Sequence, residues 1–128
     1  MRKILVLCLS ILVNTFGCHS ETNVLPTNTW SNGCMQLAPE LEGYRLTGVC
    51  CEYVQMPKVA LRGNNTFSVE GSYHSFTGAG FSNIPVQLTG YLSSDGNTLR
   101  IDYTINAHPV SYELQLGPAT VCCTCGCD

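Results

Sequence analysis

The chain has 128 residues, of which 45% are hydrophobic and 12% are charged, and its formal net charge is −3. That length suits one domain with its own core and is too short for two domains of ordinary size. The six lysine and arginine residues form no basic patch or polybasic run, which argues against a nucleic-acid partner and against a purely electrostatic attachment to anionic membranes.

The first residues are typical of a secretory signal peptide. Arg2 and Lys3 precede an apolar run over residues 4–13. Such a run is too short to cross a bilayer, which takes roughly 20 residues, and a basic start before a short apolar core is the usual form of an export signal. We predict a signal peptide over residues 1–17, with a buried first strand or helix as the alternative. Export would remove two of the six basic residues, so the mature chain is expected to be distinctly acidic.

The segment Thr15-Phe16-Gly17-Cys18 resembles the lipobox of bacterial lipoproteins, in which a small residue precedes the cysteine that becomes acylated. The resemblance implies cleavage before Cys18, attachment of two or three acyl chains such as palmitate, and a membrane-anchored position in the bacterial cell envelope. Two or more chains hold a protein firmly, whereas one is marginal. Ordinary signal cleavage after Gly17 or after Ser20 would instead give a free secreted protein.

A strict alternation of apolar and polar side chains runs through residues 84–116 and predicts three consecutive antiparallel strands. Turn residues interrupt it at 93–97 and at 106–109. A period of two buries one face of a strand and wets the other, as in an antiparallel meander and unlike a helix. The predicted core positions are Ile84, Val86, Leu88, Leu92, Leu99, Ile101, Tyr103, Ile105, Val110, Tyr112, Leu114 and Leu116.

Further strands are expected upstream of this meander. Residues 44–53 change parity at Gly48-Val49, which indicates a β-bulge. Residues 56–62 and 66–74 form a predicted hairpin about Gly63-Asn64-Asn65, because glycine and asparagine tolerate the positive φ angles of tight turns. The buried face of this hairpin is expected to consist of Phe67, Val69, Gly71 and Tyr73.

Two segments show no steady period. Residues 18–40 are predicted to be a tether and loop, in which Trp30 closes one end of the core or, alternatively, stacks on a ligand. The connection 75–83 contains Phe76 and Phe81, which we expect to be lids of the core or aromatic contacts at the mouth of a pocket.

These elements predict an all-β fold. No stretch of 10 to 12 residues has a helical period, and six or seven strands are spaced by 8 to 15 residues. This spacing is typical of a single small antiparallel β-barrel or sandwich of six to eight strands. The expected β domain covers residues 41–121, and a cysteine-rich tail follows at 122–128.

The β domain has a resemblance of its own. Leu41-Glu42-Gly43-Tyr44-Arg45-Leu46 is similar to the opening strand of the lipocalin-like, or calycin-like, domains of small bacterial lipoproteins, and segments 65–69 and 92–99 are similar to their later hairpins. The similarity covers roughly residues 41–117. It implies a closed or half-open barrel able to hold a small apolar ligand, although such families also include members whose interior is filled with side chains.

The cysteines fall into two groups. Cys8 leaves with the signal peptide, and an exported chain meets oxidising conditions, in which disulfides are expected. The disulfide candidates are Cys34, Cys50, Cys51, Cys122, Cys123, Cys125 and Cys127. Bridges between the upstream and downstream groups would tie the tail back to the barrel. If Cys18 is acylated, one of these seven thiols has no partner; if Cys18 is free, eight thiols can pair.

A metal site is the alternative use of the tail. Cys122, Cys123, Cys125 and Cys127 resemble the dense thiolates of metallothioneins, which bind Zn(II) or Cu(I). Zinc fingers space their ligands more widely than this. The three histidines also lie far from the tail in the sequence; they are His19, His74 and His108.

No catalytic motif is present. Glu70 and Asp102 lie on predicted strands with outward parity, where a carboxylate is usually solvated, and no nucleophile motif, HExxH or phosphate loop occurs. We therefore expect a non-enzymatic lipoprotein of binding or structural type, without a cofactor. Its expected partners are the membrane, through the lipid, and a small apolar ligand or an envelope protein.

Overall fold

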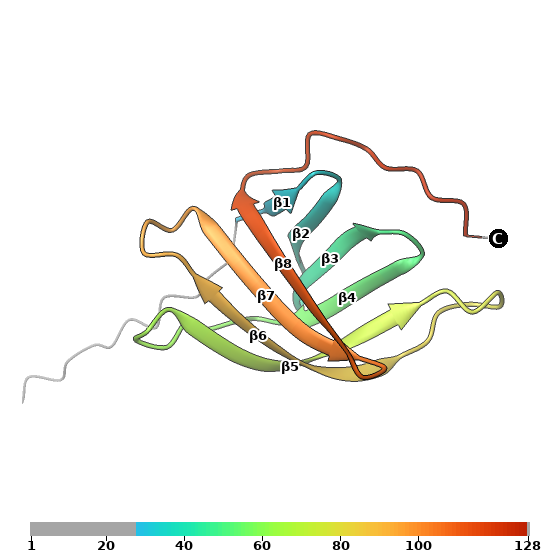
Figure 1. Cartoon of the computed structure of the whole chain (residues 1–128), viewed down its shortest axis with the longest axis horizontal. Helices are drawn as coiled ribbons and strands as arrows, with labels where there is room; N and C mark the ends of the chain where they lie inside the picture. The colour runs from blue at the N-terminus through green and yellow to red at the C-terminus, as the bar shows by residue number, and fades with distance from the viewer. Residues whose placement is uncertain (1–27, 128) are drawn as a thin grey trace, which may run out of the picture.

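The computed structural model describes residues 28–127, which form a closed antiparallel barrel with the strands in sequence order (Figure 1). This confirms the predicted all-β class. Within the described residues, no helix is long and apolar enough to cross a membrane. The strands are β1 (Trp30–Asn32), β2 (Met35–Glu40), β3 (Gly43–Val49), β4 (Glu52–Pro57), β5 (Thr66–Ser75), β6 (Ile84–Leu92), β7 (Thr98–Ile105) and β8 (His108–Leu116).

The barrel begins earlier than the sequence indicated. Residues 30–40, which the sequence predicts to be tether and loop, form strands β1 and β2. Trp30 and Leu37 stand opposite each other in this hairpin, and each is only 1% exposed. A strand of three residues cannot display a recognisable period, which explains why the sequence pattern did not reveal it. The part of the predicted tether before residue 28 lies outside the described residues.

The second half of the chain follows the prediction closely. Strands β6, β7 and β8 match the three predicted meander strands, and Leu88, Leu99 and Leu114 are fully buried. Leu116 is a correction, because 48% of it is exposed. It has the same parity as Leu114 but is the last residue of β8, so no further layer of side chains covers it.

Upstream, the predicted bulge is confirmed by a register shift between Leu46 and Val49 in the β3–β4 pair. The predicted strand over 56–62 is mostly wrong, because β4 ends at Pro57. The connection that follows turns into the barrel, so that Val59 is completely buried and Leu61 packs against the core.

We call the end of the barrel that this connection covers the closed end. The connections at 41–42, 58–65 and 93–97 lie there, and the opposite end has the turns at 33–34, 50–51 and 106–107 and the loop 76–83. Between the ends, the side chains that fill the barrel are at most 1% exposed, which leaves no room beside them for a water molecule. They are Leu37, Leu88, Leu99, Ile101 and Leu114.

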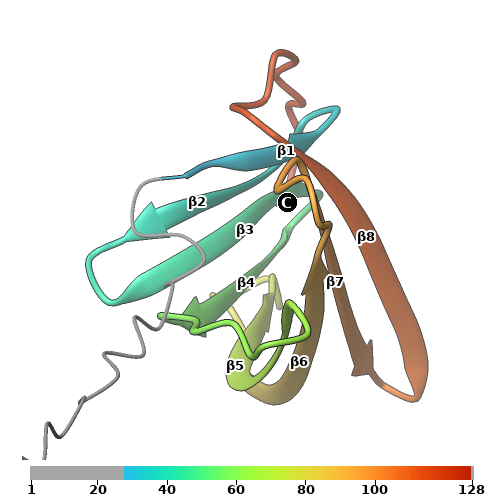
Figure 2. The ribbon, with the colours of Figure 1, turned by 90° about the vertical axis from the view of Figure 1, so that its left-hand side faces the viewer.

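The sheet is interrupted on both sides of the β7–β8 hairpin. Strands β6 and β7 pair only from Thr89–Asp102 to Leu92–Leu99, and β8 pairs with β1 only through Gln115 and Leu116. Residues 103–110 therefore pair only with each other. Figure 2 shows β8 diverging from β2 and β3 below its short contact with β1.

Two prolines lie at these interruptions. Leu92 donates its backbone N–H to the Asn65 carbonyl, so the backbone polar groups of the even-numbered residues of β6 point towards β5. The backbone of Pro85 therefore points towards β7, which does not pair with β6 at that position. On β8, Leu116 donates its backbone N–H to the Asn97 carbonyl on the β7 side. By the same parity argument, the backbone nitrogen of Pro109 points away from β7. Proline has no N–H to donate and is therefore tolerated at an edge that lacks a partner strand.

Candidate functional site

The C-terminal tail is tied to the barrel by disulfides between the two cysteine groups. The bridges join Cys34 to Cys123, Cys50 to Cys125 and Cys51 to Cys127, with Cα separations of 5.5, 5.4 and 5.5 Å. This is the expected pairing of upstream with downstream cysteines. Cys122 is exposed and forms no bridge. In Figure 1 the tail leaves β8 and runs past the β1–β2 hairpin towards the β3–β4 turn.

Local contacts direct the tail towards these cysteines. Ser31 donates its hydroxyl to the Gly117 carbonyl at 2.8 Å, and Ala119 donates its backbone N–H to the Gln36 side chain at 2.9 Å. Gly48, with a φ of +92°, lets the β3–β4 hairpin approach the Cys34 backbone, since a Cβ there would lie 2.1 Å from the Cys34 carbonyl oxygen. The glycine therefore allows the cysteine-bearing turns to lie side by side.

The structure does not assemble the four tail thiols as one ligand set, because three of them are bonded to upstream cysteines. Within residues 28–127 no group of three or more potential ligands lies close enough to hold a metal ion. His74 instead stacks on Tyr53 and hydrogen-bonds Ser72, and His108 is exposed. The thiolate alternative would require the bridges to be reduced. Cys18 and His19 lie outside the described residues.

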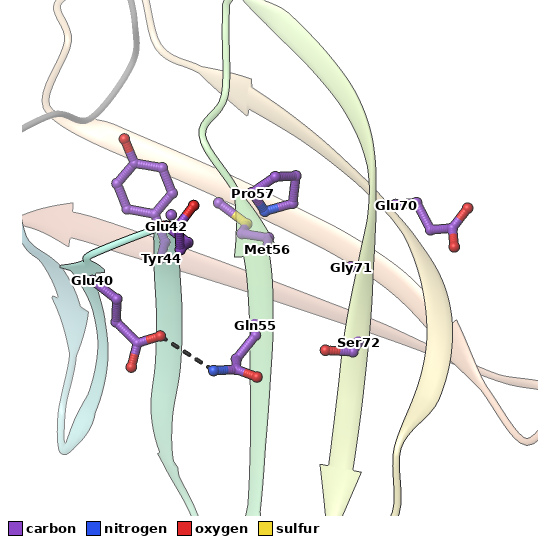
Figure 3. A pocket seen from close by; sticks show the side chains of 10 residues that line it. Glu40, Glu42, Tyr44, Gln55, Met56, Pro57, Glu70, Gly71 and Ser72 are labelled. Atoms are coloured by element: carbon purple, nitrogen blue, oxygen red, sulfur yellow. Dashed lines mark hydrogen bonds between the residues drawn. The ribbon is translucent and has the colours of Figure 1, made fainter.

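An acidic groove lies on the outer wall between the β2–β3 turn and strands β4 and β5. Its volume is about 360 Å³. Figure 3 shows Gln55 hydrogen-bonded to Glu40 across the groove and Glu70 pointing away from it. Arg45 neutralises Glu40 through an ion pair at 2.6 Å. The carboxylates of this groove are therefore either paired or solvated.

The other residues considered from the sequence also lie on the outer wall. Asp102 forms an ion pair with Arg100 at 3.0 Å. Phe76 and Phe81 are not lids of the core: Phe81 is 51% exposed, and the two rings pack against each other. Phe81 also packs edge-on against Tyr53 at a centroid distance of 5.2 Å.

The inner wall at the end opposite the closed end carries aromatic and polar side chains. Three tyrosines converge there from β5, β7 and β8, and Glu52 joins them from the start of β4. Tyr73 and Tyr103 are each 6% exposed, whereas Glu52 and Tyr112 are half-buried. We call these four residues the tyrosine cluster and this end of the barrel the tyrosine end.

The tyrosine rings lie in contact but are tilted relative to one another. The Tyr73 and Tyr103 centroids are 6.4 Å apart at an interplanar angle of 43°, and those of Tyr103 and Tyr112 are 6.2 Å apart at 52°. On the inner face Glu52 is a diagonal neighbour of Tyr73, since Val54, two residues further along β4, pairs directly with Tyr73, and Tyr112 lies beside Tyr103. At the tyrosine end, the filled apolar core is thus followed by a layer of polar groups.

Burial and the neighbouring carboxylate keep these hydroxyls protonated. Burial first, and then the Glu52 carboxylate, raise the pKa of Tyr73 to about 12. Burial and the neighbouring Tyr112 raise the pKa of Tyr103 well above its ordinary value. Both residues therefore act as neutral hydrogen-bonding groups at neutral pH and not as phenolates.

These raised values predict how stability depends on alkaline pH. A tyrosine whose folded pKa lies above its unfolded value of about 10 gives its full stabilisation below pH 10. For Tyr73 this contribution should be lost as the pH rises from about 10 to about 12. Denaturant unfolding across that interval should show the fall, and Tyr73→Phe should make it shallower. Tyr91→Phe, at a position 47% exposed, is the matched control; an equal effect of both variants would contradict the prediction.

Sequence reasoning placed the three tyrosines on buried strand faces but did not recognise them as a site, and it did not single out Glu52. An available signal was the parity of β4, in which Glu52 alternates in phase with the buried Val54 and Met56. A carboxylate on the inward side of a strand is uncommon unless it has a partner. That these residues meet, however, depends on the closure of the barrel.

Comparison of the chain with protein-family models, with curated protein sequences and with solved structures finds no match.

Proposed function

We propose that this protein is an exported, non-enzymatic barrel, anchored in a bacterial cell envelope through lipid on Cys18, that binds a small ligand at its tyrosine end. The observation that carries the binding function is the convergence of Glu52 with three tyrosines at the margin of an otherwise apolar core. Polar groups that converge beside an apolar surface are typical of ligand sites, where they orient the bound molecule.

The disulfides support export. Three bridges in a domain of about a hundred residues are usual outside the cytoplasm and rare within it. The cysteine count is compatible with an acylated Cys18, since the three bridges leave only Cys122 without a partner among the described cysteines. In the alternative, a free secreted protein, Cys18 would be available to pair with Cys122.

Intact-mass measurement of the membrane fraction tests the anchor. We expect the mature chain to begin at Cys18 and to show the added mass of two or three acyl chains. Cys18→Ser should remove this mass and release the protein, whereas Cys122→Ser should leave both mass addition and location unchanged. A soluble chain with a Cys18–Cys122 disulfide in non-reducing peptide maps would instead establish the secreted alternative.

The filled core limits where a ligand can lie. Leu88, Leu99 and Leu114 are fully buried in the middle of the barrel, so we place the ligand at the tyrosine end and not along the axis. The filled core also favours the second candidate, a structural or interaction protein that binds no small molecule. The two candidates differ in whether a small molecule perturbs the tyrosine cluster.

A non-enzymatic role agrees with the state of the tyrosines. A tyrosine that acts as a base or nucleophile needs a lowered pKa, whereas the pKa values of Tyr73 and Tyr103 are raised. The cluster is therefore suited to holding a molecule by hydrogen bonds and ring contacts.

A further inference from the structure

We propose that the tyrosine end binds a small organic cation, such as a primary ammonium group on a short apolar stem, with Glu52 as its counterion. This inference rests on the proposed function, because it names the chemical class of the ligand for the same site. Three features carry it: a carboxylate that forms no ion pair, three tyrosine rings at the same end of the barrel, and a groove beside the β7–β8 hairpin.

The carboxylate of Glu52 has no cationic partner in the described part of the chain. The two ion pairs there join Arg45 to Glu40 and Arg100 to Asp102. Lys58 and Arg62, the remaining lysine and arginine of the described residues, belong to the connection at the closed end. A half-buried charge is costly unless it is paired, so a ligand cation would supply what this end of the barrel lacks.

The three tyrosine rings at this end add a second attraction for a cation. An aromatic face carries negative electrostatic potential and attracts an ammonium group within about 6 Å. The raised pKa values keep the Tyr73 and Tyr103 hydroxyls neutral, so the cluster has a single negative charge, on Glu52. That charge matches a monovalent cation.

One groove of the outer wall reaches the edge of the cluster at Tyr103. This groove of about 570 Å³ lies where β6 and β7 separate, and it reaches Tyr103 and Val110 between Gln87 and Thr104. Over residues 103–112, neither outer edge of the β7–β8 hairpin has a partner strand. The inward residues of this hairpin can therefore meet a ligand when the hairpin shifts, while the rest of the sheet keeps its hydrogen bonds.

Calorimetric titration of the oxidised, exported protein at neutral pH tests the inference. The probes are 2-phenylethylammonium, its neutral counterpart 2-phenylethanol, and the anion 3-phenylpropionate. We expect the ammonium to bind about tenfold more tightly than the alcohol, and the anion to bind most weakly. Glu52→Gln keeps the shape of the side chain and should abolish the preference for the cation. Glu70→Gln, on the outer wall, is the matched control and should preserve it.

A second pair of variants tests the ring faces. Tyr112→Phe keeps the ring and should retain the cation preference, whereas Tyr112→Leu should weaken ammonium binding. Equal binding of ammonium and alcohol, unchanged in Glu52→Gln, would overturn the cation inference and leave the ligand site standing. Absence of binding by all three probes up to roughly 10 mM, beyond which affinity is negligible, would overturn both proposals.

Discussion

Replacing Cys123, Cys125 and Cys127 together by serine is expected to remove at least about 5 kcal/mol from the free energy of unfolding. Each of these residues holds one bridge to the barrel, over sequence separations of 89, 75 and 76 residues. A cross-link restricts the unfolded chain, and one that closes about 90 residues contributes roughly 4–5 kcal/mol in the chain-entropy model. Because small domains are stable by only about 5–15 kcal/mol, the variant should be close to unfolding.

The three bridges should not contribute equally. Once Cys34–Cys123 is formed, the bridge from Cys50 to Cys125 closes a new loop of only about 18 residues, worth roughly 3 kcal/mol. The bridge from Cys51 to Cys127 then closes a few residues and adds about 1.5 kcal/mol. Loss of either Cys50–Cys125 or Cys51–Cys127 alone leaves the neighbouring bridge in place and should cost only about 1.5 kcal/mol, whereas loss of Cys34–Cys123 alone should cost about 3 kcal/mol.

Guanidinium unfolding, followed by circular dichroism with and without reductant, measures these differences. Reduction of the wild-type protein should lower the midpoint to that of the triple variant. Cys122→Ser removes the neighbouring thiol without breaking a bridge and should unfold like the wild type. A midpoint that does not respond to reductant would show that the barrel does not depend on its tail.

The second large effect is expected from a pair of leucines on β8. Leu114 is completely buried, whereas Leu116, two residues further on, is 48% exposed. Leu114→Ala should lower the free energy of unfolding by about 3 kcal/mol, because it leaves a cavity in a filled core. Leu116→Ala should lower it by less than about 1 kcal/mol, because solvent already covers much of that side chain.

Denaturant midpoints of the two variants, measured side by side on the oxidised protein, test whether Leu114→Ala destabilises the barrel more than Leu116→Ala does. Both substitutions remove the same atoms from the same strand, so helix or strand propensity cannot account for a difference. Equal losses would mean that Leu116 is buried in solution, as the alternation in the sequence alone predicts.

The sequence by itself determined the fold class and the positions of most strands. Alternation over residues 84–116 placed β6, β7 and β8 nearly residue for residue, because a strand that is buried on one face must alternate. The parity change at Gly48-Val49 located the bulge for the same reason. The grouping of cysteines before and after the meander also indicated which groups would pair, since disulfide chemistry depends on few residues and on the compartment.

Local pattern did not suffice where an element is short or lies at the end of the barrel. Strand β1 has three residues, the segment after Pro57 turns inward to bury Val59, and Leu116 loses its cover at the end of β8. In each case burial depends on which segments lie beyond the residue, and alternation contains no information about that.

Only the tertiary structure decided the candidate site. Glu52, Tyr73, Tyr103 and Tyr112 come from four different strands, and they meet because the barrel closes with a particular stagger between neighbouring strands. Alternation tells which face of a strand a residue occupies, but not its height along the barrel axis. That height follows from the register of all eight pairings together, including the short β1–β8 contact that closes the barrel.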